Sequence, residues 1–137
     1  MSASEHVNRT LFHGTAHVFG EGETIDPQVN SNNGNMMGMY LENNKPHAYV
    51  TSSKDSAERY AGIAADWHGT LFAPVYEVED NPDIHSAVET LQKHGYDEKT
   101  TKHPNIRNMY YSEKSIKPKK VASWVVNPNI NSSYDSF

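Results

Sequence analysis

A histidine, a glycine and two tyrosines are the residues of this sequence best suited to hold a planar ring and a sugar. His13 ends the apolar run Thr10–Phe12 and is followed by Gly14 and Thr15. One imidazole nitrogen can bond a ribose hydroxyl while a backbone carbonyl fixes the other. A glycine lets its own backbone approach a planar amide, because it has no side chain. The same residues are also typical of a strand end followed by a turn.

Tyr49 and Tyr60 supply the flat apolar faces. Tyr49 lies in the strand-like run Ala48–Thr51, and Tyr60 lies on the helix-like segment that follows it. Tyrosine rings stack well on heteroaromatic rings, although each of the two alone is more typical of a packed core. We expect His13 and Tyr49 to lie on facing strands and to share one pocket. With Tyr60 on the next helix, they would clamp a flat ring attached to a ribose.

The elements that must position these residues are short strands and few helices. The helix expected over Ser53–Ala65 has Ser53 as its N-cap, and a second helix is expected over Ser86–Lys93 with a stop at Gly95. The helix that carries Tyr60 has an apolar stripe of Ala57, Tyr60, Ala61 and Ala64. The strands rich in β-branched and aromatic residues are Thr10–His13, His47–Thr51, Leu71–Glu79, Met109–Ser112 and Lys120–Val126.

This pattern predicts an α+β domain with antiparallel pairing, because most of the strands come late in the chain. The length of 137 residues fits a single domain, 1–137, in which 1–8 and 127–137 are frayed tails. The stretch Asn30–Asn44 is rich in Asn, Gly and Met, and predicts a long irregular loop.

The composition excludes several classes of site. Cysteine is absent, which rules out disulfides, thiolate metal sites and a cysteine nucleophile. The eight histidines show no metal-binding spacing, so no metal is expected. No segment is apolar enough to span a membrane, and no signal peptide is apparent, so we expect a cytoplasmic protein. We also expect it to be a monomer. A net charge of −5 argues against a nucleic-acid footprint, and the local lysines near 114–120 are more typical of a protected strand edge.

The order of these segments resembles the ADP-ribosyltransferase superfamily, whose members use NAD. The segment Tyr49–Tyr60 resembles the part of the poly(ADP-ribose) polymerases that runs from their motif tyrosine to a second, ring-stacking tyrosine. The late segment Tyr110–Pro118 resembles their closing strand region. The resemblance is strongest to the rifamycin ADP-ribosyltransferases and runs from Leu11 to Trp124.

The resemblance implies a fold and a cofactor site. The fold would be two small, mainly antiparallel sheets around an NAD cleft, with few helices. NAD would be a co-substrate, and no metal would take part. The residues that would bind NAD are His13, Gly14, Thr15, Tyr49 and Tyr60.

The resemblance also implies a catalytic set of His13, Tyr49 and an aspartate. Asp80, at the end of the expected strand Leu71–Glu79, is the best match for this acid. Asp83 is the nearest competitor and Glu113 the next. Asp80 is equally typical of an Asp-Asn-Pro turn whose carboxylate caps local backbone N–H groups.

The implied reaction transfers ADP-ribose from NAD to an acceptor and releases nicotinamide. The acceptor class stays open between a rifamycin-type small molecule, a protein and a nucleic acid. The bond to nicotinamide would break through an oxocarbenium-like state that a carboxylate stabilises. Three alternatives remain: a catalytically inactive NAD- or ADP-ribose-binding module, an NAD-dependent RNA 2′-phosphotransferase, which the net acidity disfavours, and an unrelated α+β binding protein.

Overall fold

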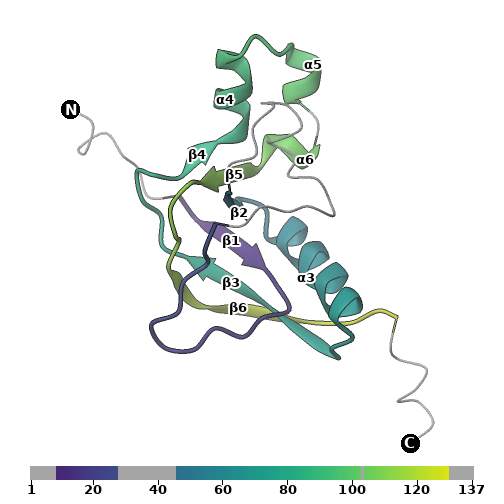
Figure 1. Cartoon of the computed structure of the whole chain (residues 1–137). Coiled ribbons are helices and arrows are strands. Elements are labelled where there is room, and N and C mark those ends of the chain that lie inside the picture. Colours follow the sequence, from purple (N-terminus) through teal and green to yellow (C-terminus); the bar gives the residue numbers. More distant parts are fainter. Residues whose placement is uncertain (1–8, 28–45, 103, 130–137) are drawn as a thin grey trace, which may run out of the picture.

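The computed structural model describes residues 9–27, 46–102 and 104–129 (Figure 1). The predicted loop Asn30–Asn44 lies outside these residues. Within them, the chain forms a six-stranded antiparallel sheet in the order β4-β5-β2-β1-β3-β6. The strands are β1 Leu11–Gly14, β2 Ala48–Thr51, β3 Phe72–Val78, β4 His85–Ser86, β5 Met109–Ser112 and β6 Pro118–Val126.

The α+β class is confirmed, but the prediction of two small facing sheets is wrong for the described residues. They form one sheet because β1 pairs with strands on both of its sides. Phe12 lies opposite Thr51 of β2 and opposite Glu77 of β3. His13 and Tyr49 therefore lie on neighbouring strands of one sheet and not on two strands that face each other across a cleft.

The helices are α3 Lys54–His68, α4 Ala87–Lys93, α5 Glu98–Thr101 and α6 Pro104–Arg107. Ser53 is the N-cap of α3, as predicted, and its side chain accepts a hydrogen bond from the Ser56 N–H. The last two helices, of four residues each, and the two-residue strand β4 were not predicted. Elements this short have no hydrophobic period that a sequence pattern can show.

The apolar stripe of α3 differs from the prediction. Ala57, Ala61 and Ala65 are buried, whereas Tyr60 is 45% exposed. An all-alanine stripe lets the helix axis approach the sheet closely, and a tyrosine in that stripe would hold the two apart.

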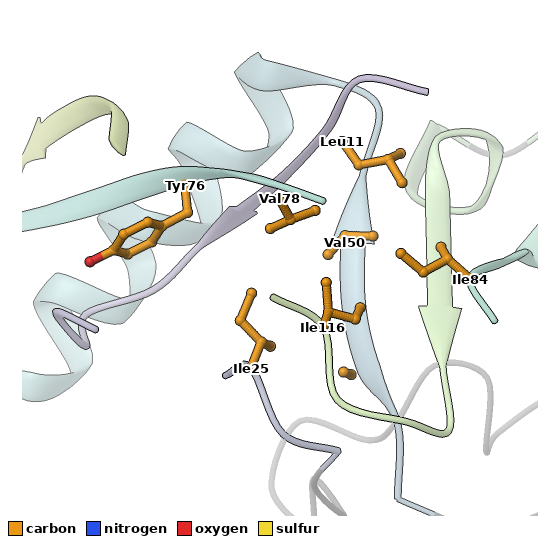
Figure 2. Packing of buried hydrophobic residues seen from close by; sticks show 8 residues of the cluster. Leu11, Ile25, Val50, Tyr76, Val78, Ile84 and Ile116 are labelled. Carbon is orange, nitrogen blue, oxygen red and sulfur yellow. The ribbon is translucent and has the colours of Figure 1, made fainter. Parts of the chain in front are cut away.

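The sheet has two differently covered faces. One, the helix face, packs Phe12 and Val75 against α3, and Tyr49 and Tyr111 against α4 and α6. These contacts belong to one face because Phe12 pairs with Thr51, and Thr51 and Tyr49 share a face by strand alternation. The other, the loop face, is covered by isoleucines from loops; Figure 2 shows its cluster of Leu11, Ile25, Val50, Tyr76, Val78, Ile84 and Ile116.

Residues 127–129, which follow β6, are among the described residues. Asn127 is buried, its amide nitrogen donates to the Thr70 carbonyl at 3.0 Å, and its backbone N–H donates to the Leu71 carbonyl at 2.7 Å. The frayed tail predicted over 127–137 therefore does not begin at Asn127; residues 1–8 and 130–137 lie outside the described part. None of the described helices is both long and apolar enough to cross a membrane.

Candidate functional site

His13 is held by the neighbouring strand through one ring nitrogen. Its Nδ1 lies 2.8 Å from the carbonyl oxygen of Tyr49. A carbonyl can only accept, so Nδ1 carries the proton and Nε2 presents a lone pair. Burial lowers the pKa of His13, against the smaller opposing effect of the bond to Tyr49, so the imidazole is neutral at pH 7. The ring is thus fixed as a hydrogen-bond acceptor at the end of β1.

The rings of His13 and Tyr49 point to opposite faces of the sheet. Tyr49 packs with Tyr111 in the cluster of the helix face. His13 alternates with Phe12 and shares the loop face with Leu11. The expectation that both rings line one pocket is therefore wrong. The contact between them runs from the imidazole to the Tyr49 backbone, across the gap between β1 and β2.

Gly14 lies beneath helix α3. A side chain built at this position would overlap the Ala57 carbonyl oxygen and lie 2.9 Å from the Ala61 nitrogen. Only glycine therefore fits between the end of β1 and the helix. The absence of a side chain serves this close packing, which is a structural requirement for Gly14 independent of any ligand.

Tyr60 is on the flank of α3 that is turned toward β2. Two contacts fix the other flank toward β6: the Ser123 hydroxyl donates to Glu58 at 2.9 Å, and Gly62 lies against Val125. Each residue of a helix is rotated by about 100° from the one before it. Tyr60 is two residues from both Glu58 and Gly62, so it lies about 160° around the helix from each of them. The exposed ring of Tyr60 is thus on the helix face, as the ring of Tyr49 is, beside β2.

On the loop face, two aromatic residues that the sequence analysis did not single out surround His13. The ring centroid of Phe19 is 6.4 Å from that of His13 and 5.1 Å from that of Tyr76. The Phe19 N–H donates to the Tyr76 hydroxyl at 2.9 Å. Tyr76 is the register partner of His13 on β3, which only the strand pairing reveals.

A hollow of about 320 Å³ opens beside this aromatic group. Its lining residues are Phe19, Gly20–Thr24, Tyr76 and Lys117–Lys120. The lysines do not form a free basic patch, since Lys117 lies 3.7 Å from Glu79 and Lys119 lies 3.4 Å from Glu77. The hollow therefore offers aromatic walls and balanced charge, adjacent to the ring of His13.

Asp80 is engaged by Arg9. Its carboxylate accepts from the Arg9 backbone N–H at 2.6 Å, from Nε at 3.0 Å and from Nη2 at 2.7 Å, and the side chain is 2% exposed. These bonds to Asp80 raise the pKa of Arg9. Arg9 also bonds the Ile84 carbonyl at 2.9 Å and lies 4.9 Å from the ring centre of Tyr110.

This placement differs from the expectation that Asp80 reaches over a bound ribose. Arg9 precedes His13 by four residues, which in extended chain is roughly 13 Å. Asp80 is thus held away from the imidazole, in an ion pair that joins the start of β1 to the end of β3. No local sequence pattern indicates this pair, because its members are 71 residues apart.

The two other acids are accessible. Asp83 is exposed and lies 3.6 Å from Lys114. Glu113 is exposed and directly follows β5, two residues after Tyr111, which is the register partner of Tyr49. Of the three carboxylates, Glu113 follows most directly from a strand that neighbours Tyr49.

Asp80→Asn is expected to lower the free energy of unfolding by about 2 kcal/mol, because it removes a charge-assisted pair and turns an amide NH₂ toward the guanidinium. Urea denaturation measures this loss. Asp83→Asn, at an exposed ion pair, serves as the control and should cost less than about 1 kcal/mol. Equal stability of Asp80→Asn and the unmodified protein would contradict a structural role for Asp80.

Among residues 9–27, 46–102 and 104–129, no three carboxylate, imidazole or thiolate side chains are grouped to hold a metal ion. Comparison with models of protein families finds no match, and no curated protein matches the chain. The site itself comprises a fixed neutral imidazole, aromatic rings on both faces of one strand end, and an adjacent hollow.

Proposed function

We propose that this protein is an NAD-dependent mono-ADP-ribosyltransferase, which transfers ADP-ribose to an acceptor and releases nicotinamide. The observation that carries the proposal is the fixing of His13 by the Tyr49 carbonyl. This bond leaves Nε2 as an acceptor for a ribose hydroxyl, at a strand end followed by Gly14 and Thr15. The resemblance of the segments around His13, Tyr49 and Tyr60 to ADP-ribosyltransferases supports the same conclusion.

Because the two rings lie on opposite faces of the sheet, one ligand could contact both only by passing over the end of β1. NAD has an aromatic ring at each end, joined by two riboses and a diphosphate. Its nicotinamide would lie on the helix face between Tyr49 and Tyr60. Its ADP-ribose would then cross to the loop face, with His13 at a ribose and the hollow beside Phe19 near the adenosine. A ligand of one ring could not use both faces.

In this arrangement, the side chains mainly hold and orient NAD. His13 accepts from a ribose hydroxyl and fixes the sugar as positive charge develops at its anomeric carbon. Loss of nicotinamide leaves an oxocarbenium-like centre, which a nearby carboxylate stabilises and the acceptor attacks. Asp80 is already bound by Arg9, which leaves Glu113 and Asp83 as candidates for this carboxylate. We assign it to Glu113, because Glu113 directly follows β5, the strand that pairs with Tyr49.

A catalytically inactive NAD- or ADP-ribose-binding module is the second candidate. The Arg9–Asp80 pair favours it, because the acid that best matches the family is used to hold the fold together. The two candidates differ in whether an accessible carboxylate reaches the reacting carbon, and not in how NAD binds.

Mass spectrometry of nicotinamide release from NAD tests the proposal. The protein is incubated with NAD alone, and then with rifampicin, cell protein or nucleic acid as acceptors. Nicotinamide release with a mass gain on one acceptor supports transfer and names the acceptor class. Calorimetric binding of NAD without release supports the binding module. Absence of both binding and release contradicts both candidates.

Replacing Tyr49 by alanine is expected to weaken NAD binding about 10- to 100-fold, whereas Tyr49→Phe keeps most of the affinity, because stacking uses the ring face and is worth roughly 1–3 kcal/mol. Isothermal titration calorimetry measures both. Tyr60→Ala should lose a similar amount and is the cleaner variant, since Tyr60 is 45% exposed while Tyr49 is partly buried and packs against the cluster of the helix face. Equal losses for Tyr49→Ala and Tyr49→Phe would point to the hydroxyl instead of the ring.

A further inference from the structure

Among the described residues, β6 is the longer of the two edge strands of the sheet. The opposite edge, β4, has two residues, whereas β6 has nine. Among the described residues, β3 is the one strand that pairs with β6. After Val126 the chain bends under α3, where Pro128 lies near Gly62. The outer side of β6 is therefore not covered by this bend.

The first half of β6 is protected against pairing with another strand. It begins at Pro118 and carries Lys119 and Lys120. Its register with β3 shifts between Val75 and Tyr76 and again between Glu77 and Val78. Proline, lysines and bulges are the features that keep natural sheet edges from pairing.

The second half, Ser123–Val126, lacks all of these features. Its register with β3 is regular, and it carries no charge. Trp124 is 53% exposed and Val126 is 54% exposed. Phe72, which is 50% exposed, lies opposite Val126 on β3. We call Phe72, Trp124 and Val126 the edge patch. Since Val125 packs toward α3, the edge patch is on the loop face.

We propose that Ser123–Val126 pairs antiparallel with the same segment of a second copy, and that the edge patches of the two copies pack together. A two-fold axis uses the same surface on both subunits, so an uncharged patch meets no like charge across the axis. With Trp124 opposite its own counterpart, Ala122 lies opposite Val126 and Ser123 lies opposite Val125 of the second copy. Lys119 and Lys120 then lie beyond the paired segment.

The size of the patch predicts a weak dimer. Phe72 and Trp124 are half exposed, which leaves on the order of 100 Å² of each to be covered, and Val126 adds less. The sum of roughly 200–300 Å² per copy is below the roughly 800 Å² per partner of a stable interface. We therefore infer an association that depends on concentration, in which the expected monomer prevails in dilute solution.

Sedimentation equilibrium over micromolar to millimolar concentrations of the full chain tests this inference. The average mass of the unmodified protein should rise toward that of two chains. Trp124→Lys should associate more weakly, with an apparent dissociation constant at least about tenfold higher than that of the unmodified protein. Trp67→Lys is the matched control, because Trp67 is a 67% exposed tryptophan on α3 outside the patch. It should associate as the unmodified protein does.

A monomer at every concentration, or equal association of Trp124→Lys, would overturn the inference. Loss of association in Trp67→Lys alone would place the contact on α3 and also overturn it. Val126→Lys repeats the test if Trp124→Lys does not fold. Hydrogen exchange adds a readout of strand pairing: the backbone amides of Ser123–Val126 should exchange more slowly at high concentration. None of these measurements involves NAD, so the result is independent of the proposed enzymatic function.

Discussion

Replacing Gly14 by alanine should lower the free energy of unfolding by about 3 kcal/mol or more, the largest stability effect that we expect of a single methyl group in this protein. The new Cβ would overlap the Ala57 carbonyl oxygen and crowd the Ala61 nitrogen, and both are backbone atoms of a helix interior. A backbone atom cannot move to a new rotamer as a flexible side chain can. The helix α3 would have to lift away from β1, with loss of packing along its alanine stripe.

Gly62→Ala is the control for this substitution. Gly62 is inside the same helix, but a Cβ there would lie 3.7 Å from Val125 and 3.9 Å from Pro128, which is ordinary contact. Alanine is favoured over glycine in a helix by up to about 1 kcal/mol, so this variant should gain stability. Urea denaturation measures the change in the free energy of unfolding, which should be negative for Gly14→Ala and positive for Gly62→Ala. A mild loss in Gly14→Ala, similar to the change at Gly62, would show that α3 and β1 are more loosely packed.

His13→Ala should abolish nicotinamide release, with a fall of at least about 100-fold, while the protein remains folded. The substitution removes the group that we assign to the ribose and one hydrogen bond to Tyr49, but no part of the buried clusters. His17→Ala is the matched control, since His17 is an exposed imidazole in the loop that follows β1, 3.2 Å from Glu23. Turnover measured by mass spectrometry should be retained in this variant. Unfolding of His13→Ala under native conditions would instead assign His13 a purely structural role.

The stability of the unmodified protein should also depend on pH through His13. Burial lowers its pKa in the folded protein, so the unfolded chain binds the proton more tightly. The contribution of the neutral ring is present above the unfolded pKa of about 6.5 and is lost as the pH falls below it. Urea titrations between pH 7 and pH 5 should show this loss in the unmodified protein and a smaller one in His13→Ala.

The local elements of this fold follow from the sequence better than the site does. The N-cap Ser53 and the strand Met109–Ser112 were predicted as observed, because capping residues and runs of β-formers act within a few positions. The exposure of Tyr60 was not predicted, because small residues lie on more than one face of the helix around it. A wheel with small residues at Ala57, Ala61, Ala64 and Ala65 fits several orientations, and packing on the sheet selects one.

The relation between His13 and Tyr49 depends on the register between β1 and β2, which no local sequence pattern indicates. Each strand alternates, but only the pairing of Phe12 with Thr51 decides which alternation of β1 matches which of β2. A shift by one residue would have put both rings on one face. The burial of Asp80 in an ion pair depends likewise on Arg9, a partner distant in the sequence that no local pattern indicates.

The junction between β1 and β2 divides the sheet into two blocks. Among the described residues, the register joins Phe12 to Thr51 there, whereas β1 and β3 are joined at four positions and β2 and β5 at four more. One block is β4, β5 and β2, and the other is β1, β3 and β6 under α3. The hydrogen bond between His13 and the Tyr49 carbonyl connects the two blocks across this junction. Loss of the imidazole would therefore remove a hydrogen bond between the two blocks of the sheet as well as one side chain.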